Sequence, residues 1–181
     1  MRYLYILLFS IALAADDHSA EGKIDENCKD ITKDNISERS FTNEYVGTFN
    51  GKRIEYTAGL KEKVLFEKDN PDAPQASFFY TEYIAKNGNQ RPVIFSFNGG
   101  PGSASLWLHM GVLGPKVIKV PSDASDDGSP PYKIVENKLS PLSEADLVFI
   151  DPIGTGYSRA IGCHTGEEFW GCLLYTSPSP R

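Results

Sequence analysis

Two short apolar segments, residues 93–97 (VIFSF) and 147–150 (LVFI), are each followed at once by a glycine-rich turn. Their side chains are apolar at nearly every position, whereas a strand with one face in water would alternate apolar and polar residues. Strands of this kind are typical of parallel sheets that are covered by helices on both faces. The pair therefore predicts an α/β fold in which both turns lie at one edge of the sheet, beyond the carboxyl ends of its strands.

The chain before these segments predicts antiparallel strands. Residues 45–49 and 53–57 flank an Asn-Gly pair at 50–51, which supplies the positive φ angles of a type I′ hairpin turn. A short strand is expected at 64–66 and a longer, aromatic one at 76–85. Together these segments make an antiparallel meander that leads into the parallel sheet.

A short helix is predicted between the two apolar strands. Leu106, Met110 and Leu113 fall at i, i+4 and i+7, so they share one helical face. Ser103 or Ser105 lies where a side chain could cap the start of this helix.

Composition limits the class of protein. The 181 residues contain 18 Lys and Arg and 24 Asp and Glu, which gives a net charge of −6. This balance argues against a nucleic-acid partner, because phosphates are bound by a basic face. Hydrophobic residues make up 40% of the chain, which is enough to build a core. Three cysteines are too few for a disulfide scaffold, and they show no C-x-x-C spacing of a metal site.

The two ends of the chain are expected to lie outside the fold. Residues 1–14 carry one positive charge, an apolar core and a small-x-small site, the pattern of a secretory signal peptide. Residues 15–40 are polar and aperiodic, typical of a surface arm or linker. Residues 172–181 (CLLYTSPSPR) resemble translated adapter sequence and are interpreted as a non-native tail. We therefore expect a secreted or periplasmic protein with no membrane span after signal removal, in which Cys28 and Cys163 could pair.

The two glycine-rich turns are the candidate chemical sites, the first at 98–103 (NGGPGS) and the second at 151–158 (DPIGTGYS). Glycine lets backbone N–H groups approach a ligand closely, and a pre-oriented pair of such groups is what an oxyanion hole requires. A phosphate cradle is a further option, although neither turn completes G-x-G-x-x-G or continues into Gly-Lys-Ser/Thr. Tight turns without chemistry are the plain alternative, more so for the second turn than for the first.

Three blocks of sequence resemble the serine carboxypeptidase family in order and spacing: residues 91–115, residues 147–158 and, as in bacterial members, residues 168–171 (EFWG). The resemblance covers roughly residues 41–171. It implies the α/β-hydrolase fold, of which residues 41–171 would be the N-terminal part only. It also implies a secreted serine-type carboxypeptidase that hydrolyses C-terminal peptide bonds through an acyl-enzyme. Peptide or protein C-termini would be its substrates, and we expect neither a metal nor another cofactor.

The resemblance also implies roles within the first turn. The backbone N–H of Gly100 would donate to the oxyanion, while the Asn98 side chain and the Gly99 N–H would hold the terminal carboxylate of the substrate. A neutral amide and a backbone donor can bind a carboxylate without a buried Lys or Arg. Trp107 would line the leaving-group pocket or pack in the core, and His109 is expected in a surface or core role.

The catalytic serine, acid and base are not assigned to any residue of this chain. The nucleophile elbow G-x-S-x-G does not occur, and the nearest match, residues 156–160, lacks the final glycine. Asp151 ends a strand but is expected to be part of a structural turn. Because the family's elbow follows the Phe-Trp-Gly segment, the chain is expected to be a front fragment that is itself inactive.

Other functions stay open. The chain could be a non-catalytic secreted module that binds peptide C-termini, or an incomplete sheet without a stable fold. Within the same family of folds it could belong to an acyltransferase, or to a prolyl aminopeptidase, whose corresponding turn usually begins with His where this chain has Asn98.

Overall fold

A computed structural model describes residues 31, 33, 36–86, 90–99, 102–120 and 130–169. Several predicted features lie outside these described residues: the signal segment 1–14, most of the arm 15–40, Cys28, Gly100, Trp170, Gly171 and the tail 172–181.

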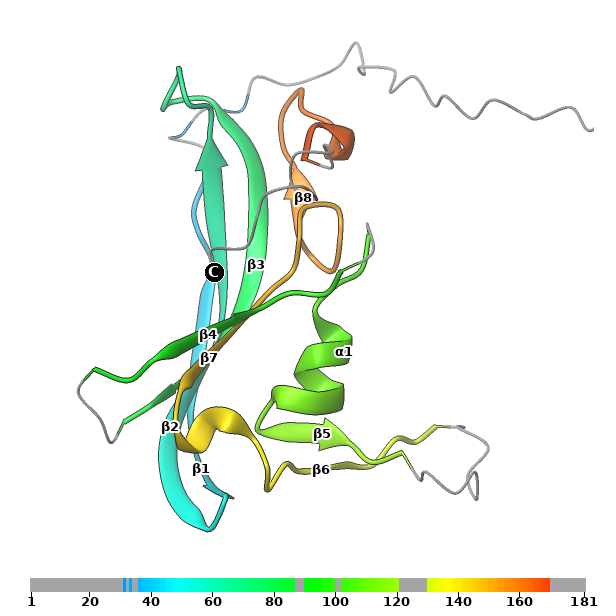
Figure 1. Cartoon of the computed structure of the whole chain (residues 1–181). Coiled ribbons are helices and arrows are strands. Elements are labelled where there is room, and N and C mark those ends of the chain that lie inside the picture. Colours follow the sequence, from blue (N-terminus) through cyan, green and yellow to red (C-terminus); the bar gives the residue numbers. More distant parts are fainter. Residues whose placement is uncertain are drawn as a thin grey trace, which may run out of the picture.

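Three long antiparallel strands form the first half of the fold: β1 (Ser40–Phe49), β2 (Lys52–Phe66) and β3 (Pro74–Ala85). The β1–β2 turn has positive φ at both Asn50 (49°) and Gly51 (76°), which confirms the predicted hairpin. The meander is confirmed too, and Figure 1 shows its strands running along the height of the molecule. The expected separate strand at 64–66 is wrong, because these residues are the continuous end of β2 and pair with β3.

A mixed sheet joins the meander to the parallel pair. β7 (Asp146–Ile150) is antiparallel to β3 and parallel to β4 (Val93–Ser96), so the strand order is β1-β2-β3-β7-β4. β8 (Arg159–Ala160) pairs with the first half of β3. Figure 1 shows β4 and β7 crossing the meander obliquely. This mixed sheet is consistent with the predicted passage from an antiparallel meander into parallel strands.

The two parallel strands differ in burial. Leu147, Val148 and Phe149 of β7 are all buried, as predicted for a strand that is covered on both faces. Val93 and Phe95 of β4 are 45% and 64% exposed, so the same prediction is wrong for β4 within the described residues. β4 is the last strand of the described sheet, and the packing that would cover it is not provided by the described part of the chain.

The predicted helix is present but changes type along its length. α1 (Leu106–Leu108) continues directly into the π-helix η2 (His109–Leu113). The Gly114 N–H donates to the His109 carbonyl at 2.9 Å, and a Cβ on Gly114 would lie 2.3 Å from that same oxygen. Glycine at 114 therefore permits the wider π turn that ends the helix.

The remaining elements are short: β5 (Lys116–Ile118), β6 (Ile134–Glu136), the 3-10 helix η3 (Pro141–Ser143) and the 3-10 helix η4 (Gly166–Phe169). β5 and β6 form a separate antiparallel ribbon below α1 in Figure 1. The core lies between the meander, β7 and η3, and its buried members are Phe49, Ile54, Tyr56, Ala85, Leu142, Leu147 and Phe149. In the described ranges, no helix has the length and apolar character that a bilayer crossing demands.

Candidate functional site

The first glycine-rich turn leaves the carboxyl end of β4 and leads to α1. Asn98 is half-buried, whereas Gly99 and Gly102 are exposed. A Cβ added to either glycine would meet no atom of the described residues within 4 Å, so no described part of the chain covers this turn. Gly102 also has a φ of +92°, a conformation that other residues rarely adopt. Gly100 lies outside the described residues, so its role as oxyanion donor stays a prediction.

The Asn98 side chain is held by the helix that follows it. Its Oδ1 accepts a hydrogen bond from the Leu108 backbone N–H at 3.3 Å. Its Nδ2 group makes no hydrogen bond to any residue in the described part of the chain. Because the amide oxygen is already engaged, the group that Asn98 can offer to a ligand is its N–H₂ donor.

Trp107 stands on α1, after the turn. Its side chain is 72% exposed, so it is not a core residue in this structure. The other interpretation, that it lines a leaving-group pocket, stays a prediction. Its neighbour Leu106 is also exposed, which leaves an apolar surface on α1 next to the turn.

The second glycine-rich turn follows β7 and is closed by its own hydrogen bonds. The Gly154 N–H donates to the Ser158 carbonyl at 3.0 Å and the Thr155 N–H to the Pro152 carbonyl at 3.0 Å. The Ser158 N–H donates back to the Thr155 carbonyl at 2.8 Å. Since these donors are used within the turn, the structure favours a structural role for it.

Asp151 and Ser105 tie the two turns together. Asp151 Oδ1 accepts a hydrogen bond from the Ser105 backbone N–H at 2.8 Å, and Ser105 Oγ donates to the Ile150 carbonyl. Ser105 is the N-cap residue of α1, but its hydroxyl makes no capping hydrogen bond, so the predicted capping role is wrong. Asp151 acts as a structural residue, as expected, because its carboxylate positions the start of α1.

Ser158 is the serine of the nearest match to a nucleophile elbow, and it is fully buried. Its Oγ donates to the Asp151 carbonyl at 2.8 Å and accepts from the Phe79 N–H at 2.8 Å. The hydroxyl is therefore engaged by the backbone of β3 and by that of Asp151, the residue after β7. This arrangement braces the turn and leaves Ser158 unable to act as a nucleophile.

His109 packs behind the first turn. Its ring stacks on Phe149 with the centroids 4.6 Å apart, and its Nε2 lies 2.6 Å from the Tyr83 hydroxyl. Burial lowers the pKa of His109, although the Asp151 charge opposes this, and burial raises the pKa of Tyr83. Of the surface and core roles expected for His109, the structure shows a partly buried ring that packs on Phe149 and Tyr83. No serine hydrogen-bonds to a histidine in the described part of the chain.

A buried ion pair fixes the parallel strands that carry the two turns. Arg91 Nε lies 3.0 Å from Asp146 Oδ1, and each side chain is 12% exposed. Asp146 Oδ1 also accepts from the Ala85 N–H at 3.0 Å, while Arg91 donates to the Leu142 carbonyl at 2.6 Å. This pair was not predicted from the sequence. Its available signal was an Arg two residues before one apolar segment and an Asp directly before the other.

The second missed cluster centres on His164. Its Nδ1 lies 2.7 Å from Glu168 and its Nε2 lies 3.0 Å from Glu67, at the end of β2. Hydrogen bonding to Glu168 raises the pKa of His164, and His164 in turn lowers that of Glu168. The i, i+4 spacing of His164 and Glu168 was the sequence signal. The adjacent Cys163 is disulfide-bonded, but the other cysteines lie outside the described residues, so its pairing with Cys28 stays a prediction.

Three known proteins to which this chain is similar have carboxypeptidase in their names. It is 34% identical over 100 residues to serine carboxypeptidase-like 36 of Arabidopsis thaliana, which covers 55% of this chain and 19% of the relative. It is 36% identical over 100 residues to the pheromone-processing carboxypeptidase KEX1 of Saccharomyces cerevisiae (strain JAY291), which covers 55% and 12%. It is 32% identical over 102 residues to the carboxypeptidase Y homolog A of Trichophyton tonsurans, which covers 56% and 17%.

The chain spans less than a fifth of the length of each of these relatives. The family model described as serine carboxypeptidase matches residues 67–164, which include β3, β4, both glycine-rich turns and β7. This match extends over more than half of the 181 residues, and the chain therefore belongs to the serine carboxypeptidase family.

Proposed function

We propose that this chain forms the part of a secreted serine-type carboxypeptidase that recognises the free C-terminus of a peptide. The observation that carries the proposal is that Asn98, with an unused amide donor, lies directly beside an open glycine turn. α1 holds the amide oxygen of Asn98 and leaves its N–H₂ group unused within the described residues. Beside it, Gly99 presents backbone with no atom within 4 Å of where a side chain would begin. These are the two donors that a terminal carboxylate would accept from.

The chemistry follows from the family. In the whole enzyme a serine hydroxyl attacks the carbonyl carbon of the last peptide bond and passes its proton to a histidine base. The C–N bond then breaks, the departing amino acid takes that proton, and water hydrolyses the acyl-enzyme. The Gly100 N–H would stabilise the oxyanion of both tetrahedral intermediates, a contribution of roughly 3 kcal/mol per donor. Trp107, exposed on α1, would flank the departing residue.

The fold agrees with this assignment. The serine carboxypeptidase family implies an α/β-hydrolase fold, and the mixed sheet with few helices is consistent with its N-terminal part. Residues 1–14 would be the signal peptide and 172–181 a non-native tail. The nucleophile, acid and base would come from a longer chain, so the 181 residues alone would be inactive.

The direct test is a titration of the 181-residue chain with N-acetyl-Phe-Ala and with its C-terminal amide, followed by backbone amide NMR. We expect the free acid to shift the Asn98, Gly99 and Gly102 signals and the amide to bind at least about tenfold more weakly. Asn98→Asp keeps the acceptor for the Leu108 N–H but replaces the donor by a negative charge, so it should abolish binding. Asn70→Asp makes the same charge change on an exposed residue of the β2–β3 turn and should leave binding unchanged.

Equal binding of the acid and the amide, or binding that survives Asn98→Asp, would contradict carboxylate recognition. A separate assay addresses catalysis: the chain should show no turnover of N-acetyl-Phe-Ala. Turnover that a serine-directed inhibitor abolishes would contradict the proposed inactivity of the chain while leaving the carboxylate site in place.

A non-catalytic module that binds peptide C-termini is the second candidate. It is favoured by the engagement of Ser158 with backbone and by the lack of any serine–histidine hydrogen bond in the described ranges. The parent gene distinguishes the two candidates. A G-x-S-x-G elbow shortly after residue 171 supports the enzyme, and a complete reading frame without one supports the module.

A further inference from the structure

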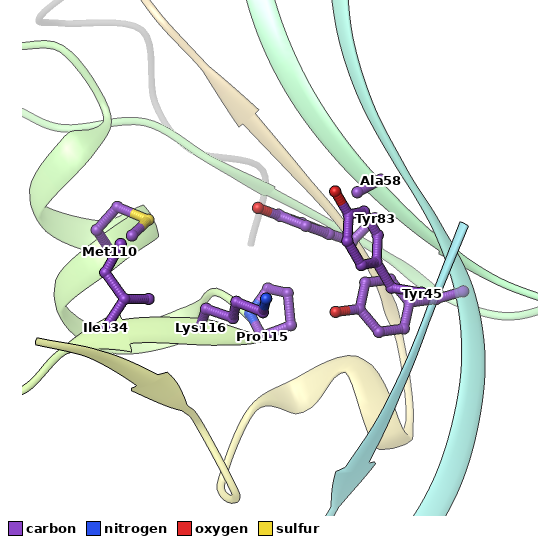
Figure 2. A pocket seen from close by; sticks show the side chains of 8 residues that line it. Tyr45, Ala58, Tyr83, Met110, Pro115, Lys116 and Ile134 are labelled. Carbon is purple, nitrogen blue, oxygen red and sulfur yellow. The ribbon is translucent and has the colours of Figure 1, made fainter. Parts of the chain in front are cut away.

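A second hollow lies between the meander and the β5–β6 ribbon, apart from the residues of the first turn. It is lined by Tyr45, Tyr56, Ala58, Tyr83, Met110, Pro115, Lys116 and Ile134. Figure 2 shows Tyr45 and Tyr83 on one side and Met110 and Ile134 on the other, with Lys116 and Pro115 along the ribbon between them. Its volume is about 180 Å³, and a cavity of about 150 Å³ is known to hold benzene, so one aromatic ring fits.

Tyr56 supplies the first sign of a ligand. Its side chain is only 3% exposed and packs against the rings of Tyr45 and Phe49, each with centroids 5.8 Å away. Its hydroxyl makes no hydrogen bond to any described residue. In the described part of the chain, every fully buried polar side-chain atom has a hydrogen-bond partner, so this hydroxyl is not fully buried. The hydroxyl is therefore accessible to solvent, and Tyr56 is one of the residues that line the hollow. Burial, together with the nearby negative charge of Glu136, raises the pKa of Tyr56, so the hydroxyl stays protonated and can donate.

Lys116 supplies a positive charge at the same place. Its ammonium lies 5.5 Å from the centroid of the Tyr45 ring and forms no ion pair with any carboxylate in the described part of the chain. Glu136, its partner across the ribbon, instead accepts from the Thr48 N–H at 3.0 Å. The Lys116 ammonium therefore contacts an aromatic ring but no carboxylate of the described residues. A bound anion could form an ion pair with it.

We propose that this hollow binds a small aromatic carboxylate, a single ring with an acid group on a short spacer. The ring would lie between the tyrosines and the apolar side chains of Met110 and Ile134. The carboxylate would accept from the Lys116 ammonium and the Tyr56 hydroxyl. The Tyr83 hydroxyl is already engaged by His109, so it contributes ring surface rather than a donor.

The test is a titration of the full chain with 3-phenylpropionate, with the neutral 3-phenylpropan-1-ol and with the non-aromatic cyclohexanepropionate. The chain has two methionines, one of them the initiator, so the Met110 methyl signal is a specific NMR probe of the hollow. We expect 3-phenylpropionate to shift this signal saturably at about millimolar concentrations, and each of the other compounds to bind at least about fivefold more weakly.

Two conservative variants test the assigned groups. Lys116→Met removes the charge and keeps the side-chain stem, and Tyr56→Phe removes only the hydroxyl; each should weaken 3-phenylpropionate binding about fivefold. Lys119→Met, a change at an exposed lysine just after β5, is the matched control and should have no effect. Asn98→Asp should also have no effect, which separates this hollow from the proposed peptide site.

The proposal is overturned if 3-phenylpropionate produces no saturable Met110 shift at about 10 mM, a range that reaches even weak sites. It is also overturned if the alcohol binds as well as the acid, or if Lys116→Met binds like the parent chain. Should Tyr56→Phe disturb amide signals outside the hollow, Lys116→Met alone decides, because Lys116 is exposed and its replacement leaves the core intact.

Discussion

The two glycine-rich turns leave neighbouring parallel strands at the same edge of the sheet, yet they use their backbone donors in opposite ways. In the second turn, the N–H groups of Gly154, Thr155 and Ser158 all bond to carbonyls of the same turn. In the described part of the first turn, Asn98 and Gly99 make no backbone–backbone hydrogen bond of this kind. Similar composition thus produces a second turn whose donors bond within the turn and a first turn whose described donors do not.

The two turns are also mechanically linked, since Ser105 in one segment binds Asp151 in the other. The closed turn therefore acts as a fixed support from which the open turn projects. Changes in the closed turn should act on stability, and changes in the open turn should act on binding.

The largest effect is expected for Gly156→Ala in the closed turn. Gly156 has a φ of +53°, and a Cβ there would lie 2.3 Å from Asp151 Oδ2, so both backbone strain and a clash follow. We expect a loss of about 3 kcal/mol in the free energy of unfolding, measured by urea denaturation. The matched change Gly99→Ala in the open turn meets no atom within 4 Å and should alter stability by less than about 0.5 kcal/mol. Equal losses in the two variants would remove the distinction between the turns.

The next largest effect is expected for Ser158→Ala. This change removes the donor to the Asp151 carbonyl and leaves the buried Phe79 N–H without its acceptor. The unpaired N–H should reduce the free energy of unfolding by about 2 kcal/mol, measured in the same way. Ser103→Ala is the control in the first turn, where the serine has no hydrogen bond within the described residues, and it should be near neutral. A neutral Ser158→Ala would show that the closed turn does not depend on its hydroxyl.

Sequence patterns predicted the local structure of each element well, but they predicted poorly what packs around it. The Asn50-Gly51 pair specifies its own turn through φ preferences, so the hairpin could be predicted from two residues. The burial of β4 depends on what packs over it, and an apolar run such as Val93 to Phe95 does not encode that neighbour. The close approach of Gly114 to the His109 carbonyl, which makes the last turn of the helix a π-helix, can be seen only in coordinates.

The same division holds at the site. Asn98 and Gly99 could be singled out because their residue types have few uses in a turn after an apolar strand. The hydrogen-bond partner of Asn98 could not be predicted, because the sequence does not fix where α1 begins and therefore which backbone N–H, here that of Leu108, is left to bind Asn98. The bridge from His164 to Glu67 joins residues 97 positions apart, and no local pattern connects them.

The third effect tests the open turn directly and acts on binding. Gly99→Ala places a methyl group where the proposed carboxylate would approach the backbone N–H, so it should weaken N-acetyl-Phe-Ala binding about tenfold with little change in stability. Gly111→Ala adds the same methyl group in η2, also into open space, and should leave binding unchanged. Unaltered affinity of the Gly99 variant would contradict the approach of a ligand to this backbone.

The smallest effects are expected from the two histidines that anchor the segments behind the turns, and they should have opposite signs. His164 has a raised pKa because Glu168 and Glu67 hydrogen-bond to it, so its stabilisation is full below pH 6.5 and is lost as the pH rises through the raised value. His109 has a lowered pKa because it is buried, so its stabilisation is full above pH 6.5 and declines as the pH falls. Urea denaturation at several values between about pH 5.5 and 8.5 should therefore show His164→Gln most destabilised at the acidic end and His109→Gln at the basic end. Parallel profiles for the two variants would contradict the opposite pKa shifts of His164, which is paired with two glutamates, and His109, which is packed in its neutral form.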